Sequence, residues 1–160
     1  MKITFWAMVA AFLLVGCSPK QKNAATSVDE QSIEADSTTV RQTFDSLVVA
    51  ESRAEMDPAY AESQEYAKSH DDFQKVIGQL TQDMSETDRQ LYLLDCAVSA
   101  FTRNSQHFAT HTSEMADPAN QRRMAMYGQK IREYRQVLIT SKLDDVQQRR
   151  LDSLNALIQF

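Results

Sequence analysis

Residues 85–108 read SETDRQLYLLDCAVSAFTRNSQHF, and this stretch decides the fold. Its larger apolar side chains, together with one small serine, recur at alternating intervals of three and four residues, which is the period of one face of an α-helix. Ser85, followed three residues later by Asp88, has the spacing of a capping box, so the helix should begin there. The stripe comprises Leu91, Leu94, Val98, Phe101, Ser105 and Phe108.

Two further stripes with the same period lie on either side of this stretch. Each follows an Asp-Pro pair, Asp57-Pro58 or Asp117-Pro118, which is typical of an N-cap with proline in the first helical turn. The first stripe holds Tyr66, His70, Phe73, Ile77, Leu80 and Met84, and the second holds Met124, Tyr127, Ile131, Tyr134 and Leu138.

Folding the chain back at the two turns between these stripes brings their apolar residues into one antiparallel register. That register places Phe73 beside Val98, and Phe101 beside Ile131, with Phe101 in the middle of the core. The sequence therefore predicts an all-α, antiparallel helical bundle with three long core helices. Shorter flanking helices are expected over 38–55 and from Asp144 onward, the latter being either separate from or continuous with the third long helix.

Composition argues against a loop-rich enzyme. The chain has 160 residues and only three glycines, whereas catalytic loops and phosphate cradles commonly depend on glycine. No strand-like alternation occurs, and no nucleophile elbow, phosphate-binding loop or Cys-x-x-Cys pair is present. We therefore predict no catalytic residues, no small-molecule substrate and a protein that is not an enzyme.

Charge is unevenly distributed along the chain. The formal net charge of −5 disfavours a nucleic-acid partner, because phosphate binding needs a basic surface. Residues 37–84 carry four basic and nine acidic groups, a net −5, while residues 118–142 carry six basic groups and one acidic group, a net +5. Either the two segments face each other in the fold, or the basic one is a surface for acidic headgroups or a partner.

The N-terminus has the pattern of an export signal. Lys2 precedes an apolar run from Ile3 to Val15, which is too short for a permanent transmembrane helix. The run ends in Leu14-Val15-Gly16-Cys17, which resembles the lipobox of bacterial lipoprotein precursors. The resemblance implies that residues 1–16 are a signal peptide, removed by cleavage between Gly16 and Cys17.

The same resemblance implies how and where the mature chain is held. Cys17 would carry a covalent diacylglycerol and its new amine an acyl chain such as palmitate, with no other cofactor expected. Residues 17–36 would form a lipidated, flexible tether, and residues 37–160 the helical domain. Ser18 after the cysteine, and the absence of acidic residues before Asp29, imply the cell envelope, at the outer membrane facing the periplasm.

A few side chains could carry chemistry. His107 and His111 are four residues apart on one helix, which is half of a zinc or copper site, although ordinary exposed histidines have the same spacing. His70 occupies a stripe position, where one polar group can fix the register of a bundle; a pH-sensing role is the alternative. If Cys17 is lipidated, Cys96 has no partner for an internal disulfide and is expected to be buried.

Together these features predict a non-catalytic, lipid-anchored cell-envelope protein that binds or scaffolds another envelope protein. One alternative is a holdase-like helical chaperone or stress protein of the periplasm. The other is a weak metal-binding envelope protein that uses His107 and His111.

Overall fold

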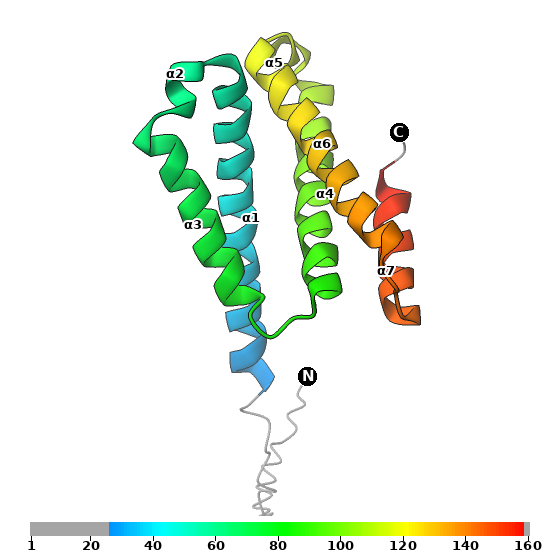
Figure 1. Cartoon of the computed structure of the whole chain (residues 1–160). Helices are drawn as coiled ribbons and strands as arrows, with labels where there is room; N and C mark the ends of the chain where they lie inside the picture. The colour runs from blue at the N-terminus through cyan, green and yellow to red at the C-terminus, as the bar shows by residue number, and fades with distance from the viewer. Residues whose placement is uncertain (1–25, 159–160) are drawn as a thin grey trace, which may run out of the picture.

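The chain folds as an all-α bundle in the computed structural model, as predicted (Figure 1). The structure describes the backbone of residues 26–158 and the side chains of residues 37–158. Within that range no β-strand occurs. The helices are α1 (Thr26–Met56), α2 (Pro58–Ala61), α3 (Gln64–Leu80), α4 (Glu86–Thr110), α5 (Thr112–Met115), α6 (Pro118–Thr140) and α7 (Asp145–Leu157).

The predicted helix starts are confirmed by their hydrogen bonds. The Ser85 hydroxyl accepts the backbone N–H of Asp88 at 3.1 Å, and Asp117 caps α6 with proline in its first turn. Asp144 and Gln147 form a reciprocal capping box at the start of α7. Because Ser141 ends α6 in an extended conformation, α6 and α7 are separate helices and the continuous alternative is wrong.

Two helix boundaries differ from the prediction. The helix expected to follow Asp57-Pro58 is interrupted after Ala61. The Ser63 hydroxyl accepts the Tyr66 N–H at 3.1 Å and caps a new helix, α3. Helix α1 begins at Thr26, inside the segment expected to be tether. Extending a helix that is already formed needs no new nucleation, which accounts for a helix start before the expected residue 38.

The arrangement of the helices confirms one predicted pairing and corrects another. Helices α4 and α6 pack side by side and antiparallel, as expected (Figure 1). Helix α3 packs on α1 instead of α4, and no Cα atom of α3 lies within 8 Å of one in α4. The ring of Phe73 accordingly lies 5.9 Å from that of Phe44, and the predicted register of Phe73 with Val98 is wrong.

Helix α1 is therefore central and not flanking. It contacts α3 on one side and α4 and α6 on the other, while α7 packs against α4 (Figure 1). Four of its apolar side chains are buried, namely Val40, Phe44, Leu47 and Val48. The core thus joins two helical hairpins, α1–α3 and α4–α6, through α1.

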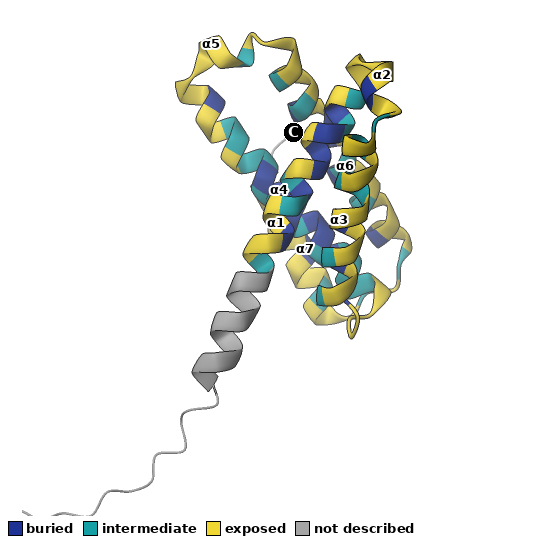
Figure 2. Ribbon diagram, turned by 90° about the vertical axis from the view of Figure 1, so that its left-hand side faces the viewer, coloured by how far each residue is buried: buried dark blue, intermediate teal, exposed yellow. Residues whose placement is uncertain are grey.

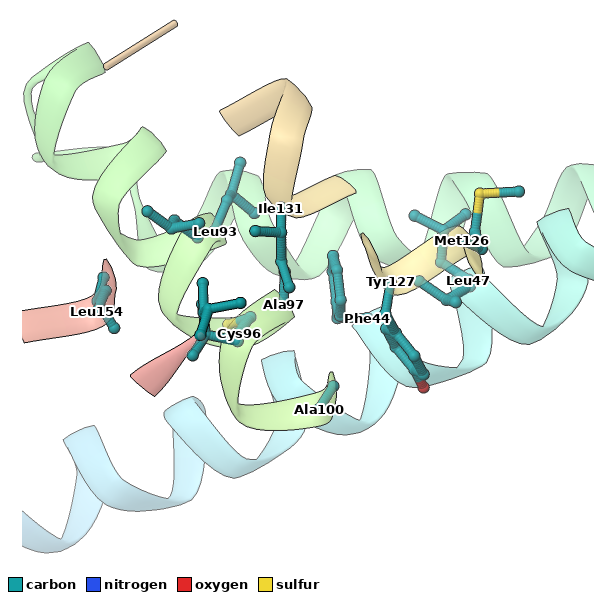
Figure 3. Close-up of a cluster of buried hydrophobic side chains, with 14 of the residues drawn as sticks. Phe44, Leu47, Leu93, Cys96, Ala97, Ala100, Met126, Tyr127, Ile131 and Leu154 are labelled. Carbon is teal, nitrogen blue, oxygen red and sulfur yellow. The ribbon is translucent and has the colours of Figure 1, made fainter. Parts of the chain in front are cut away.

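Helix α4 is buried over more of its circumference than its stripe predicts (Figure 2). Leu93, Cys96, Ala97 and Ala100 are buried although they lie off the stripe (Figure 3). The reason is that three helices, α1, α6 and α7, all pack against α4. Phe101, expected at the centre of the core, is only partly buried.

None of the helices in the described part of the chain combines the length and the apolar character that crossing a membrane requires.

Candidate functional site

The two histidines predicted as metal ligands lie together at the α4–α5 junction. His107 is in the last turn of α4, whereas His111 follows the helix as its C-cap. Their rings are stacked, with centroids 4.2 Å apart and planes inclined by 10°. The His107 Nε2 lies 2.9 Å from an oxygen of Glu114, and this hydrogen bond lowers the pKa of that carboxyl.

This geometry does not assemble a metal site. A histidine nitrogen binds a metal in the plane of its ring, and two stacked, nearly parallel rings do not direct their nitrogens at one ion. The His111 Nδ1 lies 3.0 Å from the backbone oxygen of His107, so this nitrogen is engaged in a hydrogen bond within the same turn. Among the described side chains, no three His, Cys, Asp or Glu residues are grouped so as to hold a metal ion.

His70 lies at the contact between α3 and α1, and not in a seam between α3 and α4. Its side chain is 37% exposed, and its Nε2 lies 3.9 Å from Glu51 Oε1, which is too long for a hydrogen bond. Its ring meets the edge of Tyr66 with centroids 4.8 Å apart. The prediction that His70 is a polar residue of the α3–α4 core is therefore wrong, because α3 has α1 as its neighbour.

Two largely buried charges form a pair that the sequence did not predict. Glu51 of α1 and Lys130 of α6 have side chains only 13% and 18% exposed. The Lys130 Nζ lies 3.0 Å from Glu51 Oε1 and 2.9 Å from Oε2, so one ammonium group neutralises both oxygens. A second pair, Glu55 with Arg122, joins the same two helices closer to their α2 and α5 ends.

These pairs account for part of the uneven charge along the sequence. Glu51 and Glu55 come from the acidic segment, and Lys130 and Arg122 from the basic one. The two segments therefore face each other along α1 and α6. A signal was present in the sequence, since Glu51 follows Phe44 and Val48 on the apolar side of its helix.

Asp45 extends the polar contacts of α1 to α4 and α6. The buried Tyr127 of α6 donates its hydroxyl to Asp45 Oδ1 at 3.0 Å, and Arg103 of α4 pairs with Asp45 Oδ2. Burial raises the pKa of Tyr127, and the Asp45 carboxylate beside it adds to the rise, so the phenol remains a neutral donor. Asp45 thus bridges three helices, which is a structural role.

A groove lined by both polar and apolar side chains lies between α6 and α7. Helix α7 packs on α4, and no Cα atom of α7 lies within 8 Å of one in α6. The resulting groove has a volume of about 310 Å³ and is lined by Leu138, Ile139, Ser141, Leu143, Gln148, Leu151 and Asn155. Ile139 is 65% exposed beside it, and the Asn155 Oδ1 is buried without a hydrogen-bond partner in the protein.

Cys96 is an unpaired thiol inside the core, as predicted. It is 1% exposed, and burial raises its pKa to about 12, with the neighbouring Asp95 carboxylate contributing in the same direction. The thiolate is the reactive form of cysteine, so the folded protein should hold this residue inert.

We expect Cys96 in the folded domain to resist alkylation by iodoacetamide at pH 8. In a chain that starts at Ser18, and so lacks Cys17, labelling measured by mass spectrometry should follow the denaturant-induced unfolding curve. Labelling without denaturant at the rate of a free cysteine peptide would contradict the burial of Cys96.

Comparison with known proteins finds no protein-family model, no curated protein and no solved structure that matches this chain.

Proposed function

We propose that this protein is a non-catalytic, lipid-anchored module of the cell envelope that binds or scaffolds another envelope protein. The observation that carries the proposal is Leu14-Val15-Gly16-Cys17 directly after a short apolar run. Gly16 and Cys17 lie outside the described residues, so the support is the sequence pattern itself. Two or more acyl chains on Cys17 would hold the protein stably, because each buried CH₂ contributes about 0.8 kcal/mol.

The proposed location follows from the same pattern. Ser18 after the cysteine favours the outer membrane, with the domain on its periplasmic side. A helical domain held at that surface meets other envelope proteins rather than nucleic acid, for which the full chain's net charge of −5 is unsuitable.

The binding role is supported by the groove between α6 and α7. An apolar side chain packed into a groove can contribute a large part of the binding energy of an interface. Ile139 is among the most exposed large apolar side chains of the described residues, and it lines a groove whose floor includes the buried Leu138 and Leu151. The interaction we propose is therefore docking of a partner's apolar side chains beside Ile139.

Replacing Cys17 with serine tests the anchor. The variant should accumulate as a full-length precursor and should not incorporate a radioactive fatty acid in growing cells, because the thiol that forms the thioether is missing. Cys96→Ser is the matched control and should be processed and labelled normally. Fatty-acid labelling of the Cys17→Ser protein would remove the basis for a lipid anchor.

Replacing Ile139 with aspartate tests the binding surface. With a photo-crosslinking residue fixed at Gln148, which lines the groove, ultraviolet light should give one defined adduct in intact cells. The Ile139→Asp substitution should reduce this adduct at least about tenfold, since a carboxylate placed in an apolar contact must be desolvated. The matched control is Val49→Asp on α1, another exposed apolar position at 43%, and it should leave the adduct unchanged.

Two outcomes of that experiment would favour other functions. If Gln148 gave many weak adducts, and the purified domain suppressed aggregation of unrelated unfolded proteins, the holdase alternative would replace the scaffold. Stoichiometric zinc or copper binding that is lost when both His107 and His111 become alanine would instead support the metal-binding alternative. The stacked rings do not favour it.

A further inference from the structure

We draw no further inference here: the strongest candidate, the polar groove that Glu51, Tyr66 and Lys130 line between α1, α3 and α6, holds charges that already neutralise each other, and nothing in the structure shows what occupies it.

Discussion

Replacing Phe44 with alanine should lower the free energy of unfolding by about 3–5 kcal/mol, the range for removing a buried aromatic ring. Phe44 is 0% exposed, and its ring centroid lies 5.9 Å from Phe73 of α3 and 6.4 Å from Tyr127 of α6. Its ring is therefore shared by the two hairpins, and its loss would leave a cavity where they meet. Urea denaturation of the purified domain, followed by circular dichroism, measures the change.

Phe101 provides the matched control, because it has the same side chain on α4 and is only partly buried. Phe101→Ala should cost at least about 1 kcal/mol less than Phe44→Ala, since less apolar surface is transferred to water. Equal losses, or a larger loss at Phe101, would contradict a core centred on α1 and would restore the arrangement predicted from the stripes.

The helices themselves were predictable because their signals are local. A cap such as Ser85 or Asp144 acts on backbone groups two or three residues away, so the sequence alone contains the whole interaction. The interruption at Ser63 was missed for the opposite reason. Asp57-Pro58 is a strong start signal, and one serine six residues later carries no mark that distinguishes a new cap from an ordinary helical residue.

The neighbour of each helix could not be predicted in the same way. An apolar stripe shows that one face is buried, but it does not identify the helix that covers it. The stripe that includes Phe73 and Ile77 fits α1 as well as α4. Phe44 and Val48 belong to the helix that was expected to flank the core, although both are 0% exposed at the centre of the bundle.

Helix α4 shows a second limit of stripe analysis. Ala97 and Ala100 are small and give a weak apolar signal, yet they are 0% and 2% exposed. Small side chains allow neighbouring helices to approach closely, so they can be buried by several neighbours without adding to a heptad pattern. This burial comes from the tertiary arrangement and has no local signature.

The candidate sites likewise combine features that have a local signal in the sequence with features that arise only from the tertiary arrangement. The four-residue interval between His107 and His111 correctly indicated that the two side chains lie close together. However, α4 ends at Thr110, so His111 is no longer in helical geometry. Two histidines four residues apart point in the same direction only when both are in the helix. Glu51 and Lys130 lie far apart in the sequence, and the place of Glu51 on the apolar side of its helix does not identify its partner. Only the packing of α1 against α6 makes them a pair.

Replacing Lys130 with methionine should lower the free energy of unfolding by about 2 kcal/mol, because the Glu51 carboxylate would remain in a largely buried position without its cation. The aliphatic length of methionine retains part of the packing of the lysine stem, so most of the loss should reflect the charge. The neighbouring His70 does not replace the ammonium in the native geometry, since its Nε2 lies 3.9 Å from Glu51 Oε1. Urea denaturation at pH 8 measures this change.

A double-mutant cycle separates the pair from general damage to the helix contact. Glu51→Leu with Lys130→Met removes both charges, so the double variant should be more stable than Lys130→Met alone, as is found when a buried ion pair is replaced by apolar residues. Arg122→Met is the matched control on the same helix. Its partner Glu55 is 36% exposed and remains hydrated, so the loss should be within about 0.5 kcal/mol. Additive losses at Glu51 and Lys130 would mean that the two groups do not stabilise each other, and that α1 and α6 are held together by their apolar contacts alone.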